Sequence, residues 1–457
     1  MNARHLAPNV DAAGGTNPYL EQQKARESNA RSYPRKLPIA LATGSGVHVV
    51  DTEGRSYIDC LAGAGALALG HNHPVVKEAI QQTLREGVPL QTLDLTTPVK
   101  QRFVDALFAC LPEAFAKKAR IQFCGPSGAD ATEAAVKLVK TATGRRSMLS
   151  FQGGYHGMTH GALSLTGCLD PKLAVAGLMP DVHFLPFPYR YRCPFGVGGD
   201  ECHRLSSAYV ERALKDPNGG ITPAAGMILE PVQGEGGVIP APDAWLREIR
   251  RITQGQGIPL IVDEIQTGLG RTGAMFAFEH AGIVPDVLLL SKAVGGGLPL
   301  SVVVYNSDLD RWAPGAHAGT FRGNQLAMAT GHATMEFVRE QRLDLHAASM
   351  GERLLGHLSA VAKSARCVGD VRGRGLMVGV EIVERDAAPD ASGARPGAPG
   401  MARRVQAEAL ARGLIVELGG RLDAVVRFLP PLIVSAEQID QIATIFEEAV
   451  VAAERAA

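Results

Sequence analysis

Six short apolar runs alternate with helix-like segments between about residues 97 and 304, and this alternation constrains the fold more than any other feature. The runs read ARIQFCG, RRSMLSF, AAGMILEP, IPLIVDE, PDVLLLS and LSVVVY. Nearly unbroken apolar residues over a strand-length stretch are typical of strands that are buried on both faces. Strands joined through helices pair in parallel, because such a crossover returns the chain to the same end of the sheet. The sequence therefore predicts an α/β fold whose large, mostly parallel sheet is covered by helices on both faces.

The rest of the chain predicts a smaller α+β unit and a leading segment. Beyond residue 335, long helical patterns precede two further apolar segments, GDVRGRGLMVGVEIV and VVRFLPPLIVS. We expect a disordered start over residues 1–16, an N-terminal segment over 17–96, a large domain over 97–335 and a small domain over 336–457. Residues 385–400 are rich in Pro, Gly and Ala and are expected to form a surface insertion that does not pack.

Composition and charge exclude several classes of protein. The chain of 457 residues has 46 basic and 46 acidic residues, so its net charge is zero. No stretch concentrates positive charge, which argues against a nucleic-acid partner. No apolar run approaches the ~18 residues of a membrane span, and the N-terminus lacks the apolar core of a signal peptide. We therefore expect a cytoplasmic protein without a membrane partner.

The cysteines indicate neither a disulfide framework nor a metal site. They are seven in number and scattered along the chain, whereas a disulfide framework uses an even, regularly spaced set. Cys193, Cys202 and His203 lie close in sequence, but the fourth ligand of a structural zinc site is missing. We expect no metal.

Residues 285–301, PDVLLLSKAVGGGLPLS, place a lysine directly after a buried strand. In doubly wound sheets ligands bind beyond the carboxyl ends of the strands, so the Lys292 amine is expected to face the ligand. Burial disfavours the ammonium form, and the neutral amine is the form that attacks an aldehyde. The three glycines that follow let the backbone pass close to a bound molecule. Taken alone, Lys292 could instead bury its stem and extend its amine into solvent.

A carboxylate stands at the end of another buried strand. Asp263 ends the run IPLIVD, where an unpaired negative charge is costly. A protonated pyridine nitrogen would supply the cation, and the ion pair would keep the ring electron-withdrawing. Gln266, three residues further on, can reach an oxygen on the same ring. Without a ligand, Asp263 and Glu264 would instead cap the following turn.

Two glycine-rich turns complete the set. Residues 125–128, GPSG, follow a strand and open a strongly helical segment, so the free amides of the helix start and the Ser127 hydroxyl can bind a phosphate. The spacing is not that of a Walker loop. In GGYHG, glycines expose Tyr155 and His156 after a strand, where an aromatic face can stack on a planar cofactor. A simple capped helix and a packed aromatic are the alternatives.

A buried lysine, a strand-end carboxylate, a phosphate site and a stacking aromatic are together what pyridoxal 5′-phosphate (PLP) requires. Their order and spacing resemble the class-III (subgroup II) aminotransferases of fold type I. The stretches EPVQGEGG, HAGTFRGNQLA and RFLPPL, at residues 230–237, 317–327 and 427–432, extend this resemblance over most of the chain. It implies a PLP-dependent aminotransferase whose large domain holds a mostly parallel sheet beside a smaller α+β domain.

The resemblance implies the roles of the residues around the ring. Lys292 forms the Schiff base with PLP and then moves the proton between the substrate carbon and the cofactor. Asp263 pairs with the ring nitrogen, so Lys292 and Asp263 are the expected catalytic residues. Gln266 lies by the ring oxygen, and Tyr155 stacks on the ring face.

The same resemblance implies the remaining cofactor contacts and the assembly. Ser127 and Gly128 hold the phosphate, and His156 and Glu230 are further expected cofactor-binding residues. Thr320 resembles the threonine that reaches the phosphate of the neighbouring subunit. The resemblance thus implies a homodimer with shared active sites.

The substrate residues also follow from the resemblance. Arg427 matches the arginine that grips the substrate α-carboxylate through two hydrogen bonds. Glu235 resembles a gate carboxylate that pairs with this arginine when an amine end enters, so that one site accepts both a terminal amine and glutamate. A structural ion pair is the alternative. Met158 stands where ornithine- and 4-aminobutyrate-type relatives have an arginine, so the partner of the distal carboxylate of glutamate is unassigned.

Within the class, NARSYPRKLP, LAGAGALALGHNHP, LQTLDLTTPVKQRF and GGYHGMTHGALSLTG are most similar to diaminobutyrate–2-oxoglutarate transaminases. These enzymes convert L-2,4-diaminobutyrate and 2-oxoglutarate to L-aspartate 4-semialdehyde and L-glutamate, often for siderophores or other secondary metabolites. Ornithine, 4-aminobutyrate or a natural-product amine as donor, and an aminomutase or racemase on the same scaffold, are the alternatives.

Two other classes fit the sequence less well. Residues 63–68, GAGALA, mimic the G-x-G-x-x-A of a dinucleotide site, but the following HNHP interrupts the helix that such a site needs. The resemblance places this stretch at the substrate pocket near the dimer interface. A non-catalytic PLP-binding regulator would need a DNA-reading appendage, and we expect neither terminus to hold one.

Overall fold

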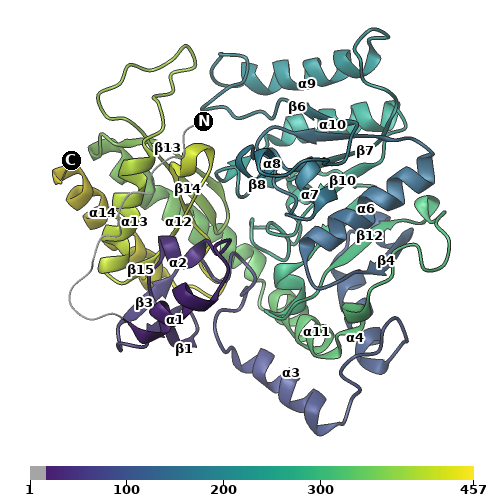
Figure 1. The fold of residues 1–457 in the computed structure, drawn as a ribbon, viewed down its shortest axis with the longest axis horizontal. Coiled ribbons are helices and arrows are strands. Elements are labelled where there is room, and N and C mark those ends of the chain that lie inside the picture. The colour runs from purple at the N-terminus through teal and green to yellow at the C-terminus, as the bar shows by residue number, and fades with distance from the viewer. Residues whose placement is uncertain (1–16, 457) are drawn as a thin grey trace.

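The computed structural model describes residues 17–456, so the disorder expected for residues 1–16 lies outside the described residues. Its largest element is a seven-stranded sheet in the order β4-β12-β11-β10-β7-β5-β6 (Figure 1). The strands are β4 (Ala119–Phe123), β5 (Ser147–Phe151), β6 (Val182–Leu185), β7 (Ala224–Leu229), β10 (Leu260–Asp263), β11 (Val287–Leu290) and β12 (Val302–Asn306). β12 runs antiparallel to both of its neighbours, and every other pair is parallel. The sheet is therefore mostly parallel, as the apolar runs predict.

Helices cover both faces of this sheet. Successive side chains of a strand point to opposite faces, so Ile261 and Val262 of β10 enter different cores. Ile261 packs with α6 (Gly128–Thr143), whereas Val262 belongs to the larger core that includes α10 (Asp243–Gly255) and α11 (Gln325–Glu340). Burial on both faces explains why these strands are apolar throughout.

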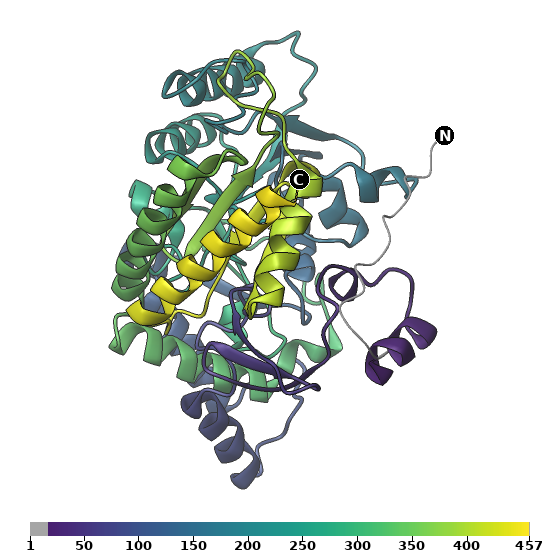
Figure 2. The same cartoon turned by 90° about the vertical axis from the view of Figure 1, so that its left-hand side faces the viewer.

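The C-terminal part of the chain forms an antiparallel sheet in the order β13-β14-β17-β16. Its strands are β13 (Val368–Arg374), β14 (Met377–Ile382), β16 (Glu417–Gly419) and β17 (Val425–Phe428). The helices α12 (Leu343–Ser364), α13 (Pro399–Ala411) and α14 (Ala436–Arg455) lie side by side against it (Figure 2). Across β16 and β17 the register pairs Glu417 with Arg427, so both side chains leave the sheet at the same level.

The N-terminal segment joins this C-terminal unit through a second sheet, β1-β2-β3-β15. Its strands are β1 (Leu41–Ser45), β2 (His48–Asp51), β3 (Ser56–Asp59) and β15 (Leu414–Ile415). β15 comes from the C-terminal part and pairs in parallel with β3. The helices of this segment are α1 (Pro18–Arg26), α2 (Tyr33–Lys36) and α3 (Pro74–Arg85), and α3 projects from the body in both views (Figures 1 and 2).

The expectation that the insertion at residues 385–400 does not pack is wrong. Ala394 and Ala398 are buried. Arg395 donates hydrogen bonds to the backbone carbonyls of Arg366 at 2.7 Å and Val368 at 3.0 Å. The backbone also bonds to the body, since the Ala398 amide donates to the Ile382 carbonyl at 2.9 Å and the Glu384 amide to the Pro396 carbonyl at 2.8 Å.

The remaining α-helices and strands of the described chain lie outside these units. They are α4 (Pro98–Cys110), α5 (Glu113–Ala116), α7 (His160–Leu165), α8 (Asp170–Leu173), α9 (Glu201–Lys215) and the hairpin of β8 (Val232–Gln233) and β9 (Ile239–Pro240). Within residues 17–456, no helix is both long and apolar enough to cross a bilayer.

Candidate active site

The carboxyl ends of the parallel strands meet at one edge of the large sheet, where ligands bind in folds of this kind. The strands β11, β10, β7 and β5 are neighbours in this order, and Lys292, Asp263, Glu230 and Tyr155 lie at or just beyond their ends. A cavity of about 490 Å³ opens there. It is lined by all the expected cofactor and substrate residues except Thr320 and Arg427, namely Ser127, Gly128, Tyr155, His156, Glu230, Glu235, Asp263, Gln266 and Lys292.

Lys292 begins a 3-10 turn directly after β11 and is held in a left-handed backbone conformation, with φ of 51°. This conformation costs a non-glycine residue roughly 1–2 kcal/mol, and such strain is concentrated at functional sites. Burial lowers the pKa of the Lys292 amine, and the negative charge of Glu235 offsets this only in part. The site therefore shifts the amine toward its neutral form, which is the nucleophilic one.

Asp263 is fixed by hydrogen bonds to both of its carboxylate oxygens. His156 Nδ1 donates to Oδ2 at 2.8 Å, and the Ile265 amide donates to Oδ1 at 3.1 Å. Both Asp263 and His156 are buried. Because an ionised carboxylate only accepts hydrogen bonds, the contact places the imidazole proton on Nδ1. His156 thus orients a buried carboxylate toward the cavity, where it can pair with a cation.

Gln266 links the cavity to the turn at residues 61–66. Its Nε2 donates to the Ala64 carbonyl at 3.1 Å, while its Oε1 is buried without a hydrogen-bond partner among the described residues. Ala62 and Ala64 have positive φ, so this stretch is a series of turns, and α3 begins only at Pro74. The G-x-G-x-x-A mimic therefore does not open a helix and is no dinucleotide site.

The first residues of α6 form one side of the cavity, and this side is expected to hold the phosphate. Ser127 is its N-cap and Gly128 its first helical residue. Amides in the first turn of a helix have no helical acceptor, so with Ser127 they form a site for an anion. A Cβ on Gly128 would lie 2.7 Å from Ile265 Cδ1, so Ile265 would have to shift to admit a side chain.

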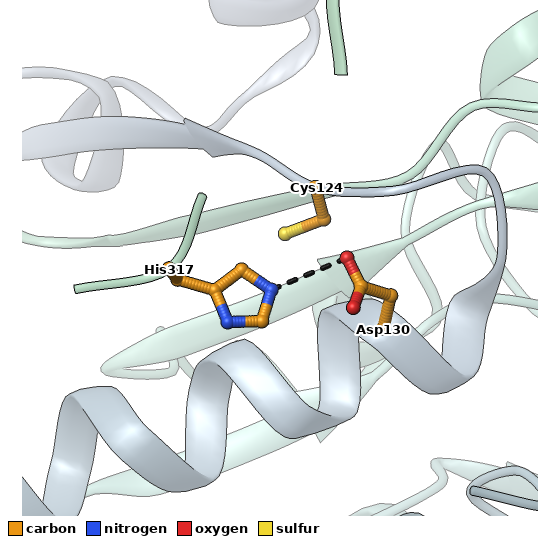
Figure 3. A group of neighbouring side chains, drawn as sticks. All are labelled: Cys124, Asp130 and His317. Atoms are coloured by element: carbon orange, nitrogen blue, oxygen red, sulfur yellow. Dashed lines mark hydrogen bonds and ion pairs between the residues drawn. The ribbon is translucent and has the colours of Figure 1, made fainter. Parts of the chain in front are cut away.

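A polar cluster of Cys124, Asp130 and His317 ties down the loop before α6 (Figure 3). Asp130 accepts hydrogen bonds from the Gly125 amide and, at 3.2 Å, from His317 Nε2. In the part of the chain that the structure describes, no other trio brings potential metal-ligand atoms within 4.8 Å of one another. Burial raises the pKa of the Cys124 thiol, so the thiolate that a metal requires is disfavoured. We interpret the cluster as a support for the phosphate end.

Glu230 clamps two loops of the site. Its carboxylate accepts hydrogen bonds from the Tyr155 amide at 2.8 Å and from the Gly234 amide at 2.9 Å. Burial raises its pKa to about 7, although the neighbouring His156 opposes the shift. Glu230 therefore positions the Tyr155 loop and the segment leading to Glu235.

Arg427 lies behind Glu235, fully buried, and is held by two carboxylates. Its Nη2 donates to Glu235 Oε1 at 2.8 Å and also to Glu417 Oε2. Burial lowers the pKa of Arg427, but the two carboxylates outweigh it and the net shift is upward. The expected Glu235–Arg427 pair is thus present.

Glu417 and Tyr33, whose hydroxyl donates to Glu417 Oε1 at 3.0 Å, are missed by the sequence analysis. The signal was available, because LIVE at residues 414–417 puts a carboxylate after three apolar residues, as LIVD does at Asp263.

Two expected residues lie apart from these contacts. Thr320 is exposed in the turn η4 (Thr320–Gly323) and does not line the cavity of its own chain. Met158 does line the cavity and is 54% exposed, so an apolar side chain occupies the place of the distal arginine of ornithine-type relatives.

Comparison with known proteins agrees with this geometry. Residues 29–450 match the family described as Aminotransferase class-III. The diaminobutyrate–2-oxoglutarate aminotransferase of Rhizobium meliloti is 59% identical over 93% of this chain and 90% of its own length. The enzyme of the same name from Haemophilus influenzae is 49% identical over 95% of both chains.

Solved structures extend the comparison. An amine transaminase from an uncultivated Pseudomonas species superposes with a TM-score of 0.83 at 28% identity, over 97% of this chain and 100% of that chain. The ornithine aminotransferase of Toxoplasma gondii superposes with a TM-score of 0.79 at 26% identity, over 96% of this chain and 95% of that chain. From its sequence match and its architecture, this chain belongs to the aminotransferase class-III family.

Proposed function

We propose that this chain is a PLP-dependent transaminase that moves the terminal amino group of L-2,4-diaminobutyrate to 2-oxoglutarate. The products are L-aspartate 4-semialdehyde and L-glutamate. The observation that carries the proposal is one cavity that joins Lys292, with its lowered amine pKa, to the Glu235–Arg427 pair. The names of the relatives at 59% and 49% identity support the choice of substrates.

The residues of the cavity fit PLP. Gln266 Oε1 and His156 Nε2 are buried polar atoms without partners in the described chain, and polar atoms of this kind are satisfied by ligands or water. Ser127 and the first amides of α6 would hold the phosphate, and Tyr155 would face the ring. Asp263 would hold the ring nitrogen in its protonated form. When bound there, PLP supplies an electron sink for the carbon that carries the amine.

The protein's own groups then perform the proton transfers. Lys292 lies at the cavity wall, where burial lowers the pKa of its amine, so the amine can accept the proton from the substrate carbon and later donate it. The His156 and Ile265 hydrogen bonds hold the Asp263 carboxylate in place facing the cavity. Lys292 is the base, and Asp263 provides the electrostatic support.

Glu235 and Arg427 explain how one site accepts two kinds of substrate. While the pair is closed, the cavity presents a carboxylate, which suits an entering amine. When glutamate enters, Glu235 turns away and Arg427 binds the α-carboxylate. Burial would raise the pKa of Glu235, but Arg427 and Lys292 lower it on balance, so the gate is charged at neutral pH.

A homodimer with shared sites completes the proposal. Thr320 lies outside its own cavity, next to exposed apolar side chains. Phe321 is 59% exposed, and Leu93 and Leu95, at 51% and 69%, belong to a segment joined to it by the hydrogen bond from the Thr92 amide to the Gly323 carbonyl. Exposed apolar clusters of this kind mark interaction surfaces. A second copy of the chain would cover them and bring Thr320 to the neighbouring phosphate.

The test is a half-reaction with the PLP-loaded enzyme and L-2,4-diaminobutyrate alone, followed by absorbance. A transaminase converts the bound cofactor stoichiometrically to pyridoxamine phosphate and releases the semialdehyde. A racemase or aminomutase does not accumulate pyridoxamine phosphate, so unchanged absorbance with racemised or rearranged substrate would reject the proposal. Activity with diaminobutyrate, ornithine and 4-aminobutyrate as amino donors to 2-oxoglutarate ranks the alternative donors. If ornithine or 4-aminobutyrate were clearly preferred, it would take the place of diaminobutyrate as the assigned donor.

A further inference from the structure

The loop that carries Glu235 has little regular structure of its own. This gate loop, residues 234–238 (GEGGV), joins β8 to β9, and each of these strands is two residues long. Glycine loses more conformational freedom than any other residue when it becomes ordered, and a two-stranded hairpin is only marginally stable alone. Contacts from other segments must therefore hold Glu235 within reach of Arg427.

Three donors of the C-terminal unit bind three successive carbonyls of the gate loop. The hydrogen bonds run from the Gly420 amide to Glu235 (2.8 Å), from Arg421 Nη1 to Gly236 (2.8 Å) and from Arg372 Nη2 to Gly237 (2.6 Å). The donors lie on β13 and in the turn between β16 and β17, so they belong to the sheet that also carries Arg427. The gate carboxylate and its arginine are thus attached to one support.

Among these donors, Arg421 serves the gate loop most directly. Arg372 also pairs with Glu381, whereas the Arg421 guanidinium makes a single hydrogen bond within the described chain, to the Gly236 carbonyl. Its Cζ lies 4.8 Å from the centroid of the Tyr189 ring, and the attraction between a cation and an aromatic face holds the guanidinium there. Replacing Arg421 therefore removes a contact of the gate loop without breaking an ion pair of residues 17–456.

The same guanidinium packs against a second loop of the site. A Cβ on Gly153 would lie 2.6 Å from Arg421 Nη2, and a Cβ on Gly236 would meet the Gly153 carbonyl oxygen. The three residues thus lie against one another, and Gly153 begins the GGYHG stretch that carries Tyr155. Arg421 therefore contacts both the gate loop and the loop that presents Tyr155 to the cavity.

Resting on the function proposed above, we infer that Arg421 positions the gate loop so that Glu235 pairs with Arg427, and thereby sets the balance between amine and glutamate as substrates. Arg421 does not line the cavity, so it is a positioning residue that acts through Glu235. The closed pair needs the loop in one place, whereas the open state, in which Glu235 has turned away, does not. With Arg421 in place, the loop is already ordered before the pair forms.

Loss of the Arg421 contact therefore destabilises the closed pair relative to the open state. Glutamate binds the open state, so its apparent affinity rises as the closed fraction falls. The amine donor uses the closed state, so its apparent affinity does not rise. General damage to the site would instead weaken the binding of both substrates, and the direction of the glutamate change separates the two causes.

Arg421→Met keeps an apolar stem and removes the donor. We expect the half-saturating concentration of glutamate to fall about three- to tenfold, because ordering the backbone of one residue changes an equilibrium by roughly five- to thirtyfold and the other two carbonyl contacts remain. The half-saturating concentration of diaminobutyrate should not fall. Stopped-flow absorbance of the PLP-loaded enzyme, mixed with each substrate alone, measures both values.

Three further variants sharpen the experiment. Arg421→Lys retains a cation and a donor, so it should return the glutamate value at least part of the way. In a Glu235→Gln background the gate carries no charge, and adding Arg421→Met should change the glutamate value less than about twofold. Arg395→Met is the matched control, because Arg395 is also half-buried and donates to backbone carbonyls but does not line the cavity. It should leave the ratio of the two half-saturating concentrations unchanged, even if it lowers thermal stability.

The outcomes separate the inference from the proposed function. If the unaltered enzyme does not convert diaminobutyrate, the proposed donor fails, while the glutamate measurement still tests Arg421. If it does, but the glutamate value rises or stays unchanged in Arg421→Met and Arg421→Lys, the inference alone is overturned. An equally large fall in the Glu235→Gln background also overturns it, because Arg421 then does not act through the gate.

Discussion

Lys292 combines two properties that a structural lysine does not need. Its backbone is strained, with φ of 51°, and burial lowers the pKa of its amine. The strain is compensated elsewhere in the fold, since its neighbours Ala293 and Val294 are buried. At the scale of one residue, the structure holds an amine in a reactive form at a fixed place.

We expect Lys292→Ala to retain PLP without a covalent bond and to lose turnover by a factor of at least about 10²–10⁴, the usual effect of removing a general base. Borohydride treatment and peptide mass mapping check this directly. They should place a pyridoxyl group on Lys292 in the unaltered enzyme and on no peptide of the variant. Lys117→Ala is the control, because Lys117 is an exposed lysine paired with Glu113. Normal turnover in Lys292→Ala would remove the assigned role.

Some residues of the site could be predicted from the sequence and others could not, because only some of them have a local sequence pattern. Asp263 and Lys292 were found because a charged group at the end of an apolar run is costly unless it has a partner. Glu417 has the same signature but was overlooked because its run is short. The His156–Asp263 hydrogen bond joins residues 107 positions apart, and no local pattern encodes such a contact.

At the scale of one element, the start of α6 depends on a glycine. A Cβ on Gly128 would meet Ile265 Cδ1 at 2.7 Å, so a side chain there would displace Ile265 or the helix start. Gly128→Ala is expected to shift the helix start and weaken PLP affinity by about tenfold or more, because the loss of one or two anion hydrogen bonds costs about 1.5–3 kcal/mol each. Fluorescence titration of the apoenzyme with PLP measures the change.

A matched helical substitution provides the control for Gly128→Ala. Gly356 is exposed in α12 and a Cβ there would meet no atom within 4 Å, so Gly356→Ala should leave PLP affinity unchanged. It should also add roughly 0.5–1 kcal/mol of stability, since alanine favours a helix more than glycine. Combining Gly128→Ala with Ile265→Val removes the nearest atom and should recover part of the affinity. Full affinity in Gly128→Ala alone would contradict the close fit.

Strands were predicted correctly where the sequence has an apolar run, and elements without such a run were missed or misjudged. β4, β5, β7, β10, β11 and β12 correspond to the six apolar runs. β6 was missed because its short sequence, VHFL, is interrupted by His183 and is only partly buried. The loop at residues 385–400 was misjudged because its packing rests on contacts with other segments, the hydrogen bonds of Arg395 to the Arg366 and Val368 carbonyls and of the Ala398 amide to the Ile382 carbonyl.

At the scale of the whole molecule, buried carboxylates set the pH dependence of stability. Glu264 is 1% exposed and accepts hydrogen bonds only from neutral donors, the Phe278 amide at 2.8 Å and the Thr267 hydroxyl at 2.7 Å. Burial raises its pKa from 4.5 to about 7. Between these values the unfolded chain ionises while the folded chain stays neutral, so stability is full below pH 4.5 and falls as the pH rises toward 7.

Glu264→Gln keeps both hydrogen bonds and cannot ionise, so it should remove this loss. We expect the variant to exceed the unaltered protein by on the order of 3 kcal/mol at pH 8 and by little at pH 4.5. Midpoints of thermal unfolding at the two pH values measure the difference. Glu340→Gln, on an exposed position of α11, should show no such dependence. An equal effect of Glu264→Gln at both pH values would contradict the raised pKa.

The proposed sharing of active sites between subunits predicts that two defective variants restore activity when they exchange subunits. Lys292→Ala destroys the site of its own chain, whereas Thr320→Ala is expected to weaken phosphate binding in the site of the other chain. A mixed dimer then has one site with both defects and one intact site. If half of the dimers are mixed, about a quarter of all sites are intact, so activity at limiting PLP should rise to about a quarter of the normal value.

The subunit exchange tests whether Thr320 serves the site of its own chain or the site of its partner. Co-expressing the two variants with different affinity tags isolates the mixed dimer, which should hold about half the activity of the unaltered enzyme, because one of its two sites is intact. The control pairs Lys292→Ala with Gly128→Ala, two changes that line one cavity of one chain. In that mixed dimer each site carries one defect, so no intact site forms and activity at limiting PLP should stay low. If Thr320 served its own chain, the first pair would behave like the second, because the mixed dimer would again hold one defect in each site.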